Sequence, residues 1–214
     1  MGAVVLDMSI SLDGFVTGPD PRAGVGLGEG GERLHEWMFG RRSDSGRDEA
    51  TEVNAVITKE LFASTGAVLM GRRNFEMGIG PWGDTPFPVP CFVLTHHAHD
   101  DVVMTSGTFS FITGGLTAAL DQARAAAGGR NVLAHTPDIA QQPLRAGLLD
   151  EIQLHLVPVL LGAGRRLFDN AGQGIGELRQ IKAIQTLGVT HLYYRVTRQQ
   201  SARPPLCQDP GCKP

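Results

Sequence analysis

The sequence has little cysteine, few aromatic residues and no long hydrophobic run. Three cysteines occur among 214 residues, and aromatic residues make up 6%. Three unevenly spaced cysteines do not make a disulfide framework. The apolar run 156–161 is far shorter than the roughly 18 residues that a membrane-spanning helix needs. Residues 1–10 lack the basic segment of a secretory signal. We therefore expect a soluble, cytoplasmic chain that binds no membrane.

Charge of either sign is also modest, whereas glycine is abundant. Nineteen basic and 22 acidic residues give a net charge of −3, and no basic patch stands out. Nucleic-acid binders need such a patch to neutralise phosphates, so we expect no nucleic-acid partner. Hydrophobic residues reach 42%, which excludes disorder by composition. The 28 glycines, about 13% against a usual ~7%, indicate tight turns or close approach of the backbone to a ligand.

Apolar strand-like segments alternate with helix-like segments along the chain. The pattern predicts helices at 32–39, 52–64, 116–127 and 139–146, the last capped by Asp138, and an irregular stretch at 78–90. Strands are expected at 3–12, 67–70, 91–95, 109–113, 131–134 and 151–161, followed by a hairpin of 178–186 and 189–198. This order predicts an α/β fold with a mostly parallel sheet and an antiparallel C-terminal edge. We expect one domain, residues 1–198, and a solvated polar tail, 199–214, in which Cys207 and Cys212 bind no metal.

Glycine-rich and basic motifs follow the predicted strands. Residues 26–31 fit G-x-G-x-x-G, but they do not follow a strand directly, so we interpret them as a lid or turn. Gly71-Arg72-Arg73-Asn74 does follow a strand and leads into a helix near residue 75. Free backbone N–H groups and two guanidinium groups suit a phosphate there, although both arginines could equally be surface residues.

Three other sites have two interpretations each. Thr95 and His96 lie past a strand end, where α/β sheets bind ligands, or simply in a surface loop; metal binding by the adjacent histidines 96, 97 and 99 is not expected. Asp13 is a proton donor or an Asx-turn former. Trp37 belongs to the core or provides a substrate platform.

Several motifs resemble the dihydrofolate reductase fold, in the branch similar to the C-terminal reductase domain of the bifunctional riboflavin-biosynthesis deaminase/reductase. Weaker matches are 11–15 (Ser-Leu-Asp-Gly-Phe), 34–39, 70–73 and 92–96. The specific block is Gly-Leu-Leu-Asp-Glu-Ile at 147–152, then 155–162 and 164–168 (Gly-Arg-Arg-Leu-Phe). The resemblance implies a three-layer α/β/α domain without a Rossmann motif.

The resemblance also implies an NADPH-dependent reductase of a pterin-like or pyrimidine-like ring, as in 5-amino-6-(5-phosphoribosylamino)uracil reductase. By the family pattern, cofactor phosphates lie near 71–74, the adenosine 2′-phosphate near Thr95 and His96, and the nicotinamide near the 13–15 turn. The implied cofactor-binding residues are Gly14, Phe15, Gly71, Arg72, Arg73, Asn74, Thr95, His96, Thr136, Asp138 and Ile139. Asp13 is the candidate catalytic residue, and Trp37 the candidate substrate-binding residue. No general acid is identified, because the register of Glu32 and Glu36 is unfixed; ordered water is an allowed proton source.

Two departures from the family pattern concern phosphate binding. A glycine pair is usual after strand 131–134, but this chain has His-Thr-Pro-Asp at 135–138, where proline lacks an N–H and Asp138 adds negative charge. Asn74 replaces a common threonine. A non-catalytic or flavin-binding relative that has lost tight dinucleotide binding is therefore the alternative function, and a structural dimerisation module a third. A homodimer is expected because apolar residues 154–161 could pair or pack across a two-fold axis.

Overall fold

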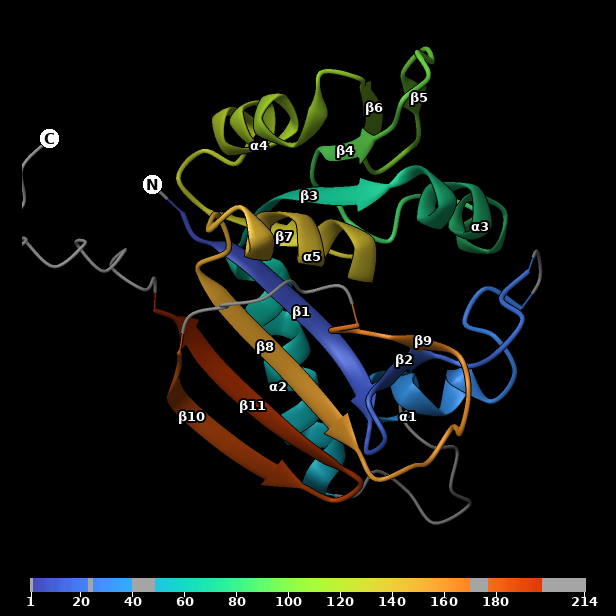
Figure 1. Ribbon diagram of the computed structural model, residues 1–214, viewed down its shortest axis with the longest axis vertical. Coiled ribbons are helices and arrows are strands. Elements are labelled where there is room, and N and C mark those ends of the chain that lie inside the picture. The colour runs from blue at the N-terminus through green and yellow to red at the C-terminus, as the bar shows by residue number, and fades with distance from the viewer. Residues whose placement is uncertain (1, 23–24, 40–48, 170–176, 198–214) are drawn as a thin grey trace, which may run out of the picture.

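A nine-stranded sheet forms the centre of the protein (Figure 1). The computed structural model describes residues 2–22, 25–39, 49–169 and 177–197. The strand order is β10-β11-β8-β1-β7-β3-β4-β6-β5. Their bounds are β1 Val4–Ser11, β3 Thr65–Gly71, β4 Cys91–Leu94, β5 Val102–Val103, β6 Thr108–Ile112, β7 Asn131–Ala134, β8 Glu151–Val157, β10 Leu178–Thr186 and β11 Val189–Val196. A small second sheet pairs β2 (Phe15–Thr17) with β9 (Arg165–Arg166).

Helices cover both faces of the sheet. On one face lie α4 (Gly115–Ala126) and α5 (Pro137–Arg145); on the other lie η1 (Gly31–His35), α1 (Glu36–Phe39), α2 (Glu49–Ser64) and α3 (Arg72–Trp82). Figure 1 shows α5 in front of the sheet and α2 behind it. In β3, Ala67 and Leu69 pack in the α4 layer, whereas Val68 and Met70 pack on the side of α3. Burial on both faces explains why β3 is a continuous apolar run.

The strand pairings confirm the expected fold class. Six neighbouring strands, β8, β1, β7, β3, β4 and β6, are parallel, and β11 and β10 add the antiparallel C-terminal edge. The short β5 forms a second antiparallel edge that was not expected. The hairpin turns at Leu187 and Gly188, as predicted. The domain boundary at 198 remains a prediction, and the tail with Cys207 and Cys212 lies outside the described residues.

Two local expectations are corrected. Helix α3 runs to Trp82 through Gly78, Gly80 and Pro81, where an irregular stretch was expected. Packing outweighs these weak helix formers, because the Phe75 and Trp82 rings both lie against Phe109. The expected helix at 32–39 begins as the 3₁₀ turn η1 and becomes α-helical only at Glu36.

The position of β8 corrects one basis for the expected homodimer. β8 pairs with β1 on one side and with β11 on the other. Its backbone N–H and C=O groups are therefore hydrogen-bonded to strands of the same chain, and β8 cannot pair with a strand of a second copy. Packing of its partly buried face is the remaining route. Among the described helices, none combines the length and apolar character needed to cross a membrane.

Candidate functional site

A cleft with a volume of about 790 Å³ opens along the carboxyl edge of the parallel strands. It is bordered by residues that follow β3, β4, β6 and β7 and, on the opposite side, by residues 17–21 and Gly26. Parallel strands direct their carboxyl ends to one edge, which is where open α/β sheets bind ligands. The volume lies within the usual ~300–1,000 Å³ of small-molecule sites.

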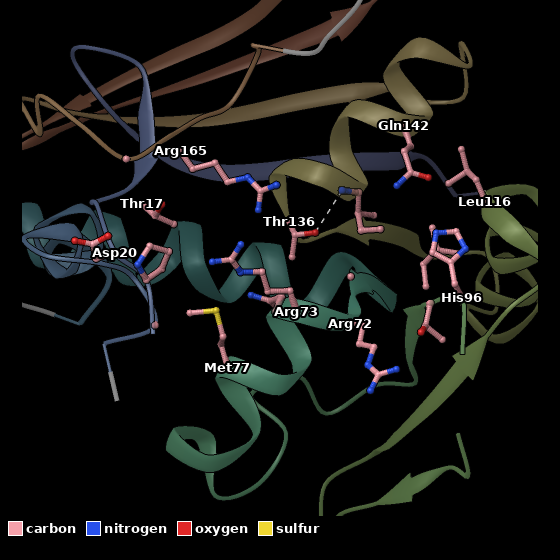
Figure 2. A pocket seen from close by; sticks show the side chains of 18 of the residues that line it. Thr17, Asp20, Arg72, Arg73, Met77, His96, Leu116, Thr136, Gln142 and Arg165 are labelled. Carbon is pink, nitrogen blue, oxygen red and sulfur yellow. Dashed lines mark hydrogen bonds between the residues drawn. The ribbon is translucent and has the colours of Figure 1, made fainter. Parts of the chain in front are cut away.

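The two arginines at the start of α3 have different environments. Gly71 is the N-cap and provides no side chain to the first-turn N–H groups. Arg72 donates from Nε to Glu76 Oε1 at 2.6 Å, so its charge is partly neutralised. Arg73 forms no hydrogen bond or ion pair with any described residue, and Figure 2 shows it reaching into the cleft while Arg72 points away. Arg73 is thus the α3 side chain best placed for a phosphate.

The start of α5 differs from the sequence expectation. Thr136 is the N-cap: its Oγ1 accepts the Ile139 N–H at 3.4 Å, and its carbonyl accepts the Ala140 N–H at 2.7 Å. Pro137 occupies the first helical position, where a missing N–H costs nothing. The prediction that Asp138 is the cap is therefore wrong, and its side chain lies outside the described part. Thr136 and Ile139 both line the cleft.

Thr95 and His96 line the end of the cleft that follows β4. Thr95 is 7% exposed, and its Oγ1 accepts the His97 N–H at 3.2 Å, whereas His96 is exposed. Leu94 and Leu116 add apolar surface beside them. His99 instead contacts Phe111, with ring centroids 4.4 Å apart. Nowhere in the described residues do three His, Cys, Asp or Glu side chains converge as metal ligands.

The opposite wall contains residues that sequence reasoning missed. Thr17 and Arg165 are paired across β2 and β9, and both line the cleft (Figure 2). Gly164 has φ +128, and a Cβ there would lie 2.0 Å from the Thr17 carbonyl oxygen, so only glycine permits this approach. The 164–168 block resembled the family, yet nothing local assigned Arg165 to the cleft. Met77 and Gln142 also line it.

Asp13, Gly14 and Phe15 do not line the cleft. The Asp13 carboxylate accepts hydrogen bonds from Ser11 Oγ (2.6 Å), Leu161 N–H (3.2 Å) and Gly162 N–H (2.7 Å). These bonds, that from Ser11 most of all, lower the pKa of Asp13 to about 2. Gly14 has φ +89, and the Arg166 guanidinium lies 4.4 Å above the Phe15 ring. These contacts are those of a turn former, the second role expected for Asp13.

Trp37 is a buried residue outside the cleft. It is 7% exposed and donates from Nε1 to Ser9 Oγ at 2.9 Å. Its ring centroid lies 4.3 Å from that of His155 and 5.0 Å from that of His191. The contacts agree with the core interpretation of Trp37.

Beneath Trp37, a hydrogen-bonded chain joins four buried side chains. His155 Nε2 lies 3.0 Å from Asp7 Oδ2, the two Nδ1 atoms of His155 and His191 are 2.7 Å apart, and His191 Nε2 lies 3.1 Å from Asn54 Oδ1. Asn54 Nδ2 donates to the Trp37 carbonyl, which turns Oδ1 toward His191. Because both ends of the chain are acceptors, three N–H groups must be shared among the four ring nitrogens. One ring is therefore an imidazolium that balances the Asp7 carboxylate.

The surroundings of the two histidine rings differ. Burial lowers the pKa of His191 to about 4, and the nearby His155 and Lys182 lower it further, so His191 is the neutral ring. Of the two rings, His155 is the one in contact with the Asp7 carboxylate, with Nε2 3.0 Å from Oδ2. Burial also lowers the pKa of His135 to about 4, although Asp7 raises it. No local sequence motif marks the four hydrogen-bonded residues, because they come from β1, α2, β8 and β11.

Comparison with known proteins places the chain in a family. No curated protein matches the sequence significantly. A structure from Shewanella sp. PV-4, of a protein whose name assigns it to riboflavin biosynthesis, aligns with a TM-score of 0.68 at 21% identity, covering 92% of this chain and 99% of the other. A pyrimidine reductase-like protein from Corynebacterium diphtheriae aligns at 0.57 and 12%, covering 92% of both chains.

The third relative is longer. The diaminohydroxyphosphoribosylaminopyrimidine deaminase/5-amino-6-(5-phosphoribosylamino)uracil reductase of Thermotoga maritima aligns at a TM-score of 0.61 and 11% identity, over 92% of this chain and 57% of that one. These low identities establish the shared fold alone. The sequence itself matches the RibD C-terminal domain over residues 3–191. The chain therefore belongs to the RibD C-terminal domain family, a family of reductase domains.

Proposed function

We propose that the protein is an NADPH-dependent reductase of a pterin-like or pyrimidine-like heterocycle. The observation that carries this proposal is the cleft along the carboxyl edge, into which Arg73 extends without a protein partner among the described residues. Two buried polar atoms on its walls, Thr17 Oγ1 and Asn74 Oδ1, also lack a partner within the described structure. Buried polar atoms are nearly always hydrogen-bonded, so these two fit a polar ligand.

The cleft residues fit the parts of a dinucleotide. Arg73 supplies positive charge for phosphate, and Asn74 Oδ1 can accept a hydrogen bond from a ribose hydroxyl or an amide. Thr95 and His96 lie at the end proposed for the adenosine 2′-phosphate, beside Leu94 and Leu116. When bound, NADPH supplies the hydride; the chain aligns the acceptor and excludes water. Since Asp13 is engaged outside the cleft, we assign the proton to ordered water.

The start of α5 supports a second candidate, a relative that has lost tight dinucleotide binding or binds a flavin. Pro137 has no N–H, and the Ile139 N–H is already bonded to Thr136. Helix amides that often hold phosphate are thus reduced in number. Changing residues 136 and 137 to glycine would restore them.

The proposed function predicts that NADPH binds and that Arg73 contributes more than Arg72. Arg73→Ala should raise the Kd for NADPH about tenfold or more, because a charge-assisted contact is lost. Arg72→Ala should have a smaller effect, because Glu76 already pairs with that charge. NADPH fluorescence titration measures both. Arg195→Ala, which removes an exposed guanidinium paired with Glu151, is the matched control.

Two results would decide against the reductase. If NADPH produces neither a fluorescence change nor a thermal shift at millimolar concentration, the proposal fails. A tight titration by a flavin in its place would establish the second candidate. Equal effects of Arg72→Ala and Arg73→Ala would remove the distinct role of Arg73.

A homodimer and a cytoplasmic location belong to the same proposal. Leu154, Leu156, Tyr194 and Val196 are only partly buried and lie on one face of β8 and β11. Leu192 is the register partner of Leu154 and shares that face. We expect light scattering to give the mass of a dimer, and Leu192→Lys to give a monomer. Val56→Lys, at an exposed α2 position, is the control; a dimer that persists in Leu192→Lys would exclude this face.

A further inference from the structure

Asn74 and Thr17 each contribute a buried polar atom without a protein partner to the walls of the cleft. Asn74 lies in the first turn of α3 and Thr17 in β2, and both residues line the cavity. Within the described residues, four buried side-chain oxygen or nitrogen atoms have no hydrogen-bond partner, and Asn74 Oδ1 and Thr17 Oγ1 are the two on residues of the cleft. Such atoms are rare, because burial removes their hydrogen bonds to water. The two atoms therefore mark a place where polar groups of a ligand bind.

Both residues lie toward the end of the cleft away from His96. Met77 follows Asn74 on α3 by three residues, a spacing that puts both on one face of a helix. The Met77 carbonyl oxygen is 3.9 Å from the position of a Cβ built on Gly26, so this face borders the glycine-rich segment. Figure 2 shows Met77 and Thr17 on one side of the view and His96 on the other. Since the adenosine 2′-phosphate is proposed to bind near His96, this end is left for the nicotinamide and the substrate ring.

The two buried atoms match a planar amide group of a ligand. Asn74 Oδ1 is an acceptor and needs a donor, whereas the Thr17 hydroxyl can donate as well as accept. An amide edge, in which an N–H stands beside a C=O, can donate to Asn74 Oδ1 and accept from Thr17 Oγ1. A phosphate has only acceptor oxygens and leaves Oδ1 unsatisfied. A ribose hydroxyl can satisfy one of the two atoms, so the amide edge is the better match.

We propose that Asn74 and Thr17 form a subsite for a planar amide edge, with Asn74 Oδ1 accepting its N–H and Thr17 Oγ1 donating to its carbonyl. The inference rests on the proposed function and deepens it by naming residues that recognise a ring. Two groups carry this chemistry: the lactam edge of an oxo-pyrimidine or pterin, and the carboxamide of nicotinamide. The contact involves no charge, so its contribution should not depend on salt, unlike a phosphate contact of Arg73.

The test uses two pairs of ligands in which one member lacks the amide N–H. 5,6-Diaminouracil is paired with its 1,3-dimethyl derivative, and NADP⁺ with its 3-acetylpyridine analogue, in which a methyl group replaces the amide NH₂. Full-length wild type, Asn74→Ala, Asn74→Leu and Thr17→Val are titrated with all four by calorimetry. In at least one pair we expect wild type to bind the N–H member about tenfold more tightly, and both Asn74 variants to lower this ratio below about twofold. Thr17→Val should weaken both members, because both keep the carbonyl.

Asn74→Leu separates recognition from packing. Leucine has nearly the size of asparagine but no polar atom, so a lost ratio cannot come from an empty space in the cleft. Because Asn74 Oδ1 has no partner among the described residues, this variant should unfold at a temperature no lower than wild type. Gln122→Leu, which removes an exposed amide from α4, is the matched control and should leave every Kd unchanged.

The two pairs also distinguish the source of the amide. A ratio that depends on Asn74 only in the uracil pair assigns the subsite to the substrate lactam, and one only in the NADP⁺ pair assigns it to the carboxamide. Ratios near one in wild type, or equal weakening of both members by the Asn74 variants, overturn the subsite. Wild type that shows the Asn74-dependent ratio with the uracils but binds no NADP⁺ or NADPH refutes the proposed reductase alone. Wild type that binds none of the ligands at millimolar concentration refutes both.

Discussion

Asp7→Asn is expected to lower the free energy of unfolding by about 3–5 kcal/mol at pH 7. Asp7 is 8% exposed and lies 3.0 Å from His155, which is 1% exposed. The substitution removes the negative charge that balances the buried imidazolium and keeps the shape of the side chain. An unbalanced buried charge is among the costliest defects in a protein core. Urea unfolding followed by circular dichroism measures the change.

A surface substitution of the same type provides the control. Asp121→Asn removes one carboxylate from an exposed position on α4, and we expect it to change stability by less than about 0.5 kcal/mol. If Asp7→Asn costs less than about 1 kcal/mol, the two histidine rings share fewer protons than their hydrogen bonds require, and the assignment of an imidazolium is wrong.

Gly164→Ala is expected to cost both stability and ligand affinity. Its Cβ would lie 2.0 Å from the Thr17 carbonyl oxygen and 2.8 Å from the Gly18 carbonyl carbon, so β9 has to move away from β2. Strain of this kind costs about 1–3 kcal/mol. The movement also changes the wall of the cleft that Thr17 and Gly164 line, so the Kd for NADPH should rise more than tenfold. Thermal unfolding and fluorescence titration measure the two effects.

Gly128→Ala separates steric conflict from backbone strain. Gly128 has φ +60, but a Cβ there meets no atom within 4 Å. We therefore expect only the ~1 kcal/mol cost of a left-handed conformation and an unchanged Kd. If Gly164→Ala behaves like Gly128→Ala, the close approach of β9 to Thr17 is not needed for the cleft.

The sequence predicted most strands because burial on both faces produces unbroken apolar runs such as 67–70. It did not predict that β8 is an interior strand, since pairing partners are set by long-range contacts and not by local pattern. The helix through Gly78 and Pro81 was missed for a related reason: Phe109, distant in sequence, supplies the packing. At α5, Thr136 and Asp138 are both good caps, and Pro137 at the first helical position decides for Thr136.

The candidate site likewise contains residues that the sequence predicted and residues that it did not. Arg73, Thr95 and Thr136 each follow a parallel strand, so topology alone brings them to one edge. Arg165 reaches the cleft through pairing between strands about 150 residues apart, which no spacing rule contains. The hydrogen bonds among Asp7, His155 and His191 could not be predicted from the sequence, because these residues lie on separate strands of the sheet.

The two-stranded unit β2–β9 is tied down from within the chain, since the Asp13 carboxylate binds the Leu161 and Gly162 amides and Arg166 binds the Asp13 carbonyl. This wall of the cleft is therefore preorganised for ligand binding. The protein therefore loses little conformational entropy when the ligand binds, and most of the contact energy appears as affinity. Capture should be a single bimolecular step, with an observed rate that rises linearly with ligand concentration and shows no plateau.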